Sequence, residues 1–291
     1  MERLTANGID FAFVDAGPRD GPLALCLHGF PDTAHTWDGL LPQLADAGFH
    51  AVAPFMRGYA PTGPAADGSY HVADLALDAI ALADALGGGS DSVLIGHDWG
   101  AVATWTAAAY QPERFRRVVA LAVAPASVLA GYMLQPEIIH NSWYQWFFQM
   151  PIAEGVVAMD DFRFIDVLWD LWSPGFTPDP DHIRGVKECL ATEGVLEAAI
   201  GYYRSTLGSA WSPPSEELEP VQGAMVSTVN APALYLHGAQ DGIYPADIVG
   251  DTELEAFVPL IEREIVEGAG HFLHLERPDV VLPRIVGFVS A

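Results

Sequence analysis

Basic residues are scarce in this sequence, which holds 13 lysines and arginines against 38 aspartates and glutamates. Lys187 is the single lysine, and the formal net charge at pH 7 is -25. Binding to DNA or RNA requires clustered basic side chains that release counterions from the phosphates. The shortage of such residues argues against a nucleic-acid partner, and the acidic surplus favours a well-solvated surface.

Cysteine is also scarce, because only Cys26 and Cys189 are present. Cys26 belongs to the apolar run LALCLHG, so a disulfide framework is not expected. The N-terminal segment lacks the basic start and apolar core of a secretory signal. The most hydrophobic stretch, residues 118–134, is interrupted by proline, serine and glycine, which favours a buried strand and a loop over a membrane span. These absences predict a cytoplasmic protein without membrane insertion.

Motifs that bind metals or phosphates are absent as well. The ten histidines form neither an H-E-x-x-H motif nor a cysteine-supported zinc pattern. The glycines at 87–89 lack the lysine and the spacing of a phosphate-binding loop. We therefore expect no metal site and no cofactor.

Short apolar runs alternate with longer amphipathic segments in the first half of the chain. The runs PLALCLHG, HAVAPF, SVLIGH and VVALAVA are typical of buried strands, and HVADLALDAIALADALGG is typical of a helix. This alternation predicts an α/β fold, in which a mostly parallel central sheet is covered by helices on both faces.

A change in composition after about residue 127 predicts a helical insertion. The segments NSWYQWFFQM and FRFIDVLWDLW are rich in aromatic residues, and a strand pattern returns only at APALYLHG. We therefore expect a core formed by residues 1–127 and 214–291, with a helical insertion of residues 128–213 after the sixth strand.

The stretch LIGHDWGA places Asp98 between two glycines, where an apolar strand turns into a helix. In this context a G-x-nucleophile-x-G turn exposes its central side chain. The five residues alone favour an aspartate that caps the next helix. Asp241 in HGAQDGIYP and His271 in EGAGHFLHLERP each follow a predicted strand. Nucleophile, acid and base follow one another in this order when such a turn is catalytic.

The segment LHGFP at residues 27–31 ends an early strand. The backbone N–H of Phe30 can there join that of Trp99 in an oxyanion hole, which stabilises negative charge during catalysis. His28 in the same segment is given a structural role, because a histidine in a turn is more often structural than catalytic.

Together the motifs HGFP, GHDWG, GAQDG and GAGHF resemble the α/β-hydrolase superfamily and, within it, the epoxide hydrolase family. The resemblance spans nearly the whole chain. It implies the α/β-hydrolase fold, with the insertion forming a helical cap over the site. It also implies that His28, Gly29 and Pro31 form a structural motif with a cis peptide bond before Pro31.

An aspartate nucleophile is suited to the epoxide reaction that the resemblance implies. When Asp98 attacks an sp3 carbon it forms an ester, whereas a serine would form an ether that this machinery could not hydrolyse. His271 would then deprotonate the hydrolytic water, and Asp241 would fix the tautomer of His271. The product of such a reaction is a vicinal diol.

Two cap tyrosines donate to the epoxide oxygen in epoxide hydrolases, one in a YQ-x-x-FQ segment and one in a YYR or WYR segment. WYQWFFQ at 143–149 places Tyr144 in the first role, and GYYRS at 201–205 places Tyr203 in the second. A phenol with a pKa of about 10 is suited to protonate a departing alkoxide. The aromatic composition of the cap further predicts a hydrophobic substrate, and the expected pocket walls are Trp143, Trp146, Phe147, Phe148 and Trp169.

Two alternatives stay open at this point. A haloalkane or haloacid dehalogenase would use the same Asp98, Asp241 and His271, and Trp99 follows the nucleophile as a halide-binding tryptophan does. Against this alternative, Phe30 stands where haloalkane dehalogenases typically carry an asparagine, and the arginine pair of fluoroacetate dehalogenases is absent. A non-catalytic, ligand-binding α/β hydrolase is less favoured, because all three triad residues are present. The sequence leaves open the physiological substrate and whether the chain forms a homodimer.

Overall fold

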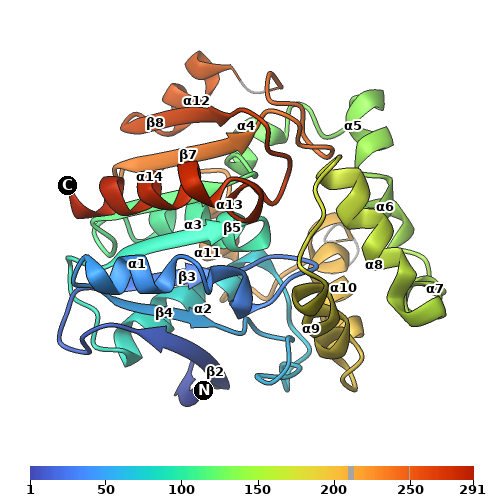
Figure 1. The fold of residues 1–291 in the computed structure, drawn as a ribbon, viewed down its shortest axis with the longest axis horizontal. Coiled ribbons are helices and arrows are strands. Elements are labelled where there is room, and N and C mark those ends of the chain that lie inside the picture. Colours follow the sequence, from blue (N-terminus) through green and yellow to red (C-terminus); the bar gives the residue numbers. More distant parts are fainter. Residues whose placement is uncertain (209–212, 249) are drawn as a thin grey trace.

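The computed structural model describes residues 1–208, 213–248 and 250–291. Its strands form one sheet in the order β1-β2-β4-β3-β5-β6-β7-β8 (Figure 1). They are β1 (Glu2–Ala6), β2 (Ile9–Ala16), β3 (Leu23–Leu27), β4 (His50–Pro54), β5 (Val93–His97), β6 (Arg117–Leu121), β7 (Ala233–Gly238) and β8 (Ile261–Val266). The pairs β1–β2 and β2–β4 are antiparallel, and all other neighbours are parallel. The expected α/β fold with a mostly parallel sheet is confirmed.

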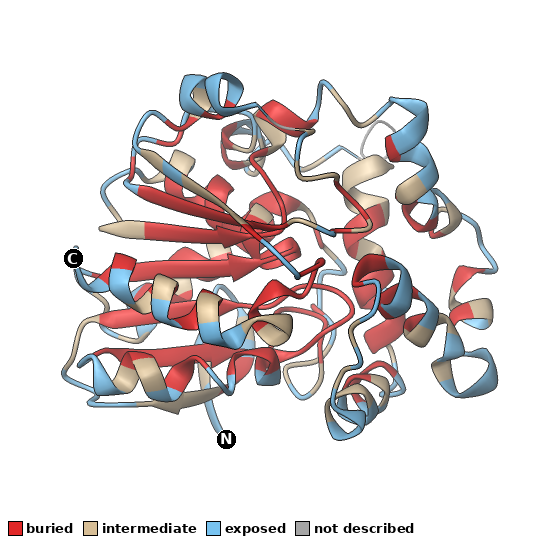
Figure 2. Cartoon of the chain, turned by 45° about the horizontal axis from the view of Figure 1, so that its top comes forward, coloured by how far each residue is buried: buried red, intermediate tan, exposed pale blue. Residues whose placement is uncertain are grey.

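The central strands are buried over their whole length, which explains why their sequences are continuously apolar. Successive side chains of β3 enter two different hydrophobic clusters, Leu25 and Leu27 the first, Ala24 and Cys26 the second. The helices on these two faces are α2 (Val72–Ala85) and α3 (Trp99–Tyr110) on the first, and α1 (Leu41–Asp46) and α14 (Pro278–Ser290) on the second. Figure 2 shows the buried strands between these helices.

The chain between β6 and β7 is helical, and its described residues contain no strand. Its helices are α4 (Ala126–Leu129), α5 (Pro136–Asn141), α6 (Trp143–Phe147), α7 (Ala153–Val157), α8 (Met159–Trp172), α9 (Pro180–Leu190), α10 (Val195–Leu207) and α11 (Glu219–Ala224). Helices α5 to α10 lie beside one end of the sheet, on the right of Figure 1, whereas α11 packs against α2 and α3. The insertion boundaries at residues 128 and 213 stay a prediction, and the second follows residues 209–212, which lie outside the described residues.

Short helical segments follow several of the strands. They are η1 (Ala34–Trp37), α12 (Asp251–Phe257) and α13 (Leu273–Glu276). Because η1 comes after β3 and α13 after β8, both lie beyond the carboxyl ends of parallel strands, which is where α/β sheets carry their ligands. Among the described residues, no helix combines the length and the apolar character that crossing a membrane requires.

Candidate active site

Asp98 occupies the sharp turn between β5 and α3. Its backbone torsions are φ 52° and ψ -117°, a positive-φ conformation that is costly for a residue with a Cβ and clusters at functional sites. The flanking glycines allow the turn. A Cβ at Gly96 would lie 2.1 Å from the carbonyl oxygen of Gly100, and one at Gly100 would lie 2.1 Å from that of Leu27. The Asp98 side chain makes no capping hydrogen bond to α3, so helix capping does not account for this residue.

The loop after β3 approaches the Asp98 carboxylate. The backbone N–H of Phe30 donates a hydrogen bond to Asp98 Oδ1 at 2.8 Å. Gly29 allows this approach, because a Cβ there would lie 2.3 Å from Asp98 Oδ1. The peptide bond between Phe30 and Pro31 is cis, as the resemblance implies. Trp99 is the first residue of α3, and the N–H groups in the first turn of a helix have no partner within it.

His28 holds this loop in place. Its Nε2 accepts a hydrogen bond from the N–H of Met56 at 3.0 Å, and its Nδ1 lies 2.9 Å from the carbonyl oxygen of Gly29. Burial lowers the pKa of His28 to about 4, so the ring is neutral near pH 7. A neutral ring with its proton on Nδ1 satisfies both contacts.

His271 links Asp98 to Asp241. Nδ1 of His271 lies 2.8 Å from Asp241 Oδ2, and Nε2 lies 3.5 Å from Asp98 Oδ2. The other oxygen of Asp241 accepts hydrogen bonds from the N–H groups of Ile243 at 2.8 Å and Tyr244 at 3.1 Å. The structure thus brings together the three residues that the sequence predicts as a triad. Asp241 is held on both of its oxygens, so it can fix the orientation of the imidazole.

The two carboxylates strongly favour the charged form of His271. Burial by itself lowers the pKa of His271, but the charge and hydrogen bond of Asp241, followed by those of Asp98, raise it to about 10. In return, His271 holds the pKa of Asp241 below its usual range in spite of burial. The imidazole is therefore protonated near neutral pH while both carboxylate partners are present.

Tyr144 of α6 and Tyr203 of α10 are buried, and both line the same cavity as Asp98. Their ring centroids lie 5.7 Å apart in an edge-to-face arrangement. Tyr144 also packs against Trp172 at 4.7 Å, and Tyr203 packs edge-on against Trp99 at 5.0 Å. Burial raises the pKa of both phenols well above the usual range. Both hydroxyls therefore carry their protons at neutral pH and can act as donors.

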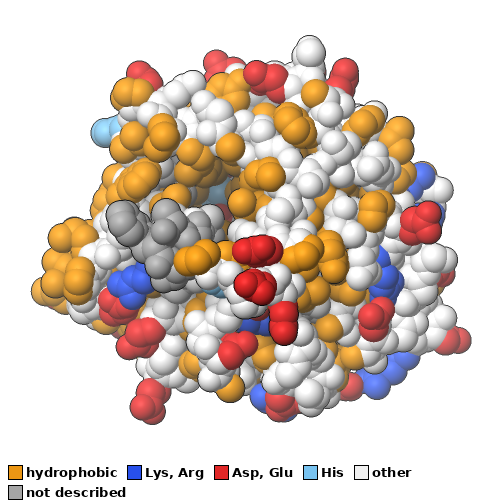
Figure 3. Space-filling model, turned by 180° about the vertical axis from the view of Figure 1, so that it is seen from behind, with side chains coloured by type: hydrophobic (Ala, Val, Ile, Leu, Met, Phe, Trp, Pro, Cys, Tyr) orange, Lys and Arg blue, Asp and Glu red, His pale blue; other side chains and the backbone are white. Residues whose placement is uncertain are grey.

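The cavity has a volume of about 200 Å³ and a mostly apolar wall. Its polar side chains are Asp98, Tyr144, Gln145, Tyr203, Thr206 and Tyr244. The other lining residues are Trp99, Val102, Val123, Ala124, Ala126, Leu129, Ala130, Met133, Leu207, Met225 and Val226. On the face shown in Figure 3, hydrophobic side chains gather around a hollow.

The five aromatic residues expected to form the pocket walls do not line this cavity. Trp143 and Trp146 are 38% and 39% exposed, and Phe147 packs against Trp143 with a centroid distance of 6.2 Å. Phe148 is buried behind Tyr203, at 5.0 Å, and Trp169 stacks on Phe272 at 3.5 Å. Trp169 belongs to α8 and is held away from the cavity by this stacking, whereas the other four residues lie in α6 or directly after it. Successive side chains point in different directions around a helix axis, so the cavity receives only Tyr144 and Gln145 from this helix.

Sequence reasoning missed Gln145, Tyr244 and the aliphatic part of the wall. Tyr244 lies three residues after Asp241 in QDGIYP, so its nearness to the predicted acid was a usable signal. Most of the aliphatic residues come from the segments after β6 and α11, whereas Val102 belongs to α3 and Leu207 to α10. No motif identifies those residues, because their place in the wall depends on how the helices pack.

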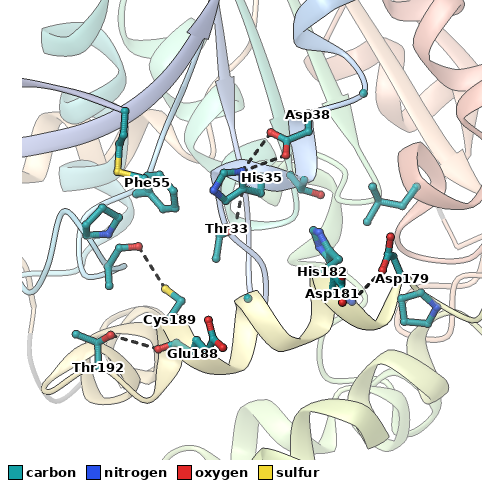
Figure 4. Close-up of a pocket in the computed structure, with 18 of the residues that line it drawn as sticks. Thr33, His35, Asp38, Phe55, Asp179, Asp181, His182, Glu188, Cys189 and Thr192 are labelled. Atoms are coloured by element: carbon teal, nitrogen blue, oxygen red, sulfur yellow. Dashed lines mark hydrogen bonds and ion pairs between the residues drawn. The ribbon is translucent and has the colours of Figure 1, made fainter.

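A larger cleft of about 900 Å³ lies between η1 and α9 (Figure 4). Polar residues such as His35, Asp38 and Asp181 line it, and none of the triad residues or cavity tyrosines does. Beside it, Nε2 of His182 lies 2.9 Å from Oδ1 of the buried Asp32, next to the cis proline. Within the described ranges, no group of three or more His, Cys, Asp or Glu side chains is placed to hold a metal ion.

Comparison with known proteins gives consistent matches. Residues 24–284 match the family described as "Alpha/beta hydrolase family". Epoxide hydrolase A of Mycobacterium tuberculosis is 30% identical over 99% of this chain and 97% of its own length. Human epoxide hydrolase 4 is 31% identical over 99% of this chain and 78% of its own length. The crystal structure of Bacillus megaterium epoxide hydrolase with an inhibitor superposes with a TM-score of 0.84 at 24% identity, over 100% of both chains.

Proposed function

The chain belongs to the epoxide hydrolase family of the α/β hydrolases, and on this premise we propose that it opens a hydrophobic epoxide to a vicinal diol. One observation carries the proposal. A single cavity of about 200 Å³ contains a carboxylate in contact with a His–Asp pair and, from the inserted helices, two buried phenols. A carboxylate provides the nucleophile, and a phenol provides the proton that a departing alkoxide requires.

In the first step Asp98 Oδ2 attacks an epoxide carbon. The new bond is an ester bond between this oxygen and the substrate carbon, and the bond from that carbon to the epoxide oxygen breaks. Tyr144 and Tyr203 bind the epoxide oxygen, which takes a proton from one of them as it becomes a hydroxyl. Oδ2 is the attacking atom, because Oδ1 is already engaged by the N–H of Phe30 at 2.8 Å.

In the second step water hydrolyses the ester. His271 Nε2 removes a proton from the water, whose oxygen attacks the carbonyl carbon of Asp98. Negative charge then develops on Oδ1, which the Phe30 N–H already contacts and which the Trp99 N–H joins in stabilising. The bond between Cγ and Oδ2 of Asp98 then breaks, and Oδ2 leaves as a hydroxyl oxygen of the diol after taking the second proton of the water. The Asp98 carboxylate is thereby restored with one oxygen from the water.

Ester formation also prepares His271 to act as a base. In the resting site the pKa of His271 is raised by Asp241 and by Asp98. The ester removes the negative charge of Asp98 and therefore one of the two causes of the raised pKa. The imidazole then gives up its proton more readily, and this proton neutralises the tyrosinate that the first step leaves. Neutral His271 is the form that can deprotonate water.

The cavity supports a small, largely apolar substrate. An apolar cavity of about 150 Å³ holds a benzene molecule. The cavity here, at about 200 Å³, accommodates an epoxide with a substituent about as large as one aromatic ring. We propose that the residues lining this cavity contact the substrate, in place of the five aromatic residues expected from the sequence.

We further propose that the helices of residues 128–213 act as the cap over this cavity, since they supply Tyr144 and Tyr203. The cytoplasmic location and the formation of a homodimer stay predictions from the sequence.

The decisive test is the His271→Ala variant, incubated separately with a panel of aromatic and aliphatic epoxides and with a panel of haloalkanes. Without its base the ester accumulates, and the protein mass increases by that of the whole epoxide, on the peptide that contains Asp98. The matched Asp98→Ala, His271→Ala double variant gains no mass. An increase equal to the haloalkane minus hydrogen halide identifies a dehalogenase instead. If neither panel gives an adduct on Asp98, the proposed function is wrong.

A further inference from the structure

Tyr244 is a third phenol in the cavity, and the mechanism above does not use it. Its backbone is fixed at both ends: the N–H donates to Asp241 Oδ1 at 3.1 Å, and the carbonyl oxygen lies 2.8 Å from Nε2 of His237. The side chain is 7% exposed and lines the cavity with Asp98. Tyr244 is therefore held rigidly, as a residue that recognises a substrate group must be.

The Tyr244 hydroxyl has one weak acceptor and one donor beside it. Its O–H is directed to Met133 Sδ at 3.5 Å, and a thioether is a weak acceptor. The Gln145 side chain donates to Tyr144 Oη at 3.2 Å and also hydrogen-bonds Tyr244, although burial outweighs this contact and raises the pKa of Tyr244 to about 12. The Gln145 amide thus occupies an acceptor position on each hydroxyl. A substrate oxygen can therefore accept the Tyr144 proton, and for the Tyr244 proton it competes with the weak acceptor Met133 Sδ.

The position of Tyr244 next to Tyr144 defines what its proton can reach. Both hydroxyls interact with the same Gln145 side chain, so they are neighbours in the cavity wall. Tyr144 is directed at the epoxide oxygen in the proposed mechanism. A second oxygen on the substrate, separated from the epoxide oxygen by two carbons, then comes beside Tyr244. The Gln145 amide, which lies beside both hydroxyls, already donates to them.

We propose that Tyr244 determines substrate specificity by donating a hydrogen bond to an ether or hydroxyl oxygen on the carbon next to the epoxide ring. This inference rests on the proposed function, and it names the substrate class as epoxides with an oxygen substituent, such as aryl glycidyl ethers. The oxygen displaces Met133 as the acceptor of the Tyr244 proton. The preference arises because an epoxide without that oxygen leaves the donor with only its thioether contact.

The test compares phenyl glycidyl ether with 1,2-epoxy-4-phenylbutane, in which a methylene group replaces the ether oxygen. The kcat/KM for each is measured with the wild-type enzyme and with Tyr244→Phe, and the ratio of ether to hydrocarbon is formed for each protein. The inductive effect of the ether oxygen on epoxide reactivity cancels when the two ratios are divided. One neutral hydrogen bond corresponds to a ratio about three- to tenfold higher in the wild type.

Two further variants serve as a control and as a test of the competing acceptor. Tyr132→Phe removes a hydroxyl that donates to the Glu253 carboxylate at 2.6 Å, outside the cavity, and it leaves the ratio unchanged. Met133→Leu removes the competing acceptor of Tyr244 and raises the ratio above the wild-type value. Equal ratios in the wild type and Tyr244→Phe overturn the role of Tyr244 while the proposed function stands. If the wild-type enzyme hydrolyses other epoxides of the panel but neither of these compounds, the substrate class is wrong, whereas the proposed function itself fails only if His271→Ala forms no adduct with any epoxide of the panel.

Discussion

At the scale of single residues, the two tyrosines placed at the epoxide oxygen differ in their contacts. Tyr144 Oη accepts a hydrogen bond from Gln145, whereas Tyr203 Oη is buried with only the Trp99 indole beside it as a donor and with no acceptor for its own proton among the described residues. A buried hydroxyl whose proton has no acceptor destabilises the folded state. Its presence at this position is explained by a partner that arrives with the substrate, namely the epoxide oxygen.

We therefore expect Tyr203→Phe to separate stability from activity. Removing the unsatisfied hydroxyl raises the free energy of unfolding by about 1 kcal/mol, while ester formation becomes about 10- to 100-fold slower because one of two donors is lost. Tyr144→Phe, the matched variant, slows the same step without the gain in stability. Urea unfolding and rapid-quench measurement of the ester give the two quantities. If both variants form the ester at the wild-type rate, the tyrosines are not the donors.

At the scale of elements, the packing of α8 against the segment that carries His271 holds the inserted helices to the core. Trp169 of α8 is 2% exposed and stacks in parallel on Phe272, with a centroid distance of 3.5 Å. The N–H of His271 donates to the carbonyl oxygen of Trp172, also in α8, at 3.0 Å. Although Trp169 does not line the cavity, its packing supports the position of His271, the proposed base.

Replacing a buried and an exposed tryptophan should show how much the stacking of Trp169 on Phe272 contributes to the free energy of unfolding. Trp169→Ala removes a fully packed ring and should lower the free energy of unfolding by about 3–5 kcal/mol. Trp146→Ala removes a ring that is 39% exposed, and its effect should stay within about 1 kcal/mol. Both values come from urea unfolding. Comparable losses in the two variants would show that the stacking on Phe272 has no special weight.

These elements also show what the sequence can and cannot predict. The grouping of Asp98, Asp241 and His271 was predictable, because each follows a strand of the parallel part of the sheet, and parallel strands bring such ends together. The orientation of α6 was not predictable. Four of the five residues of WYQWF are aromatic, so no polar face indicates which side chains enter the cavity. Tyr244 reaches the cavity only because the Asp241 carboxylate turns the backbone after it.

At the scale of the whole molecule, the pair formed by Asp32 and His182 connects the core to α9 beside the large cleft. Burial raises the pKa of Asp32, but His182 outweighs burial and brings it to about 2. Burial likewise lowers the pKa of His182, but Asp32 outweighs it, with contributions from Asp38 and Asp179, so that the net pKa is raised above 6.5. The ion pair therefore makes the stability of the fold depend on pH.

The sign of this dependence follows from the two shifts. The contribution of His182 is complete below about pH 6.5 and disappears as the pH rises through its raised pKa. The contribution of Asp32 is complete above pH 3.8 and disappears as the pH falls towards 2. His182→Asn should therefore lower the Tm clearly at pH 6 and by a smaller amount at pH 9. A difference in Tm that is equal at both values, measured by circular dichroism, would show that His182 is not charged in this pair.

The place where the inserted helices leave and rejoin the sheet has a consequence for the history of such chains. The chain departs after β6 and returns at β7, and these strands are direct neighbours, with Val118 opposite Ala233. The whole segment inserted between β6 and β7 can therefore be replaced by another without altering the order of the strands in the sheet. Asp98, Asp241 and His271 follow strands of the sheet, whereas Tyr144 and Tyr203 belong to the segment inserted between β6 and β7. A related chain with a different inserted segment would keep the residues proposed to form and hydrolyse an ester. It would act on substrates with a different leaving group.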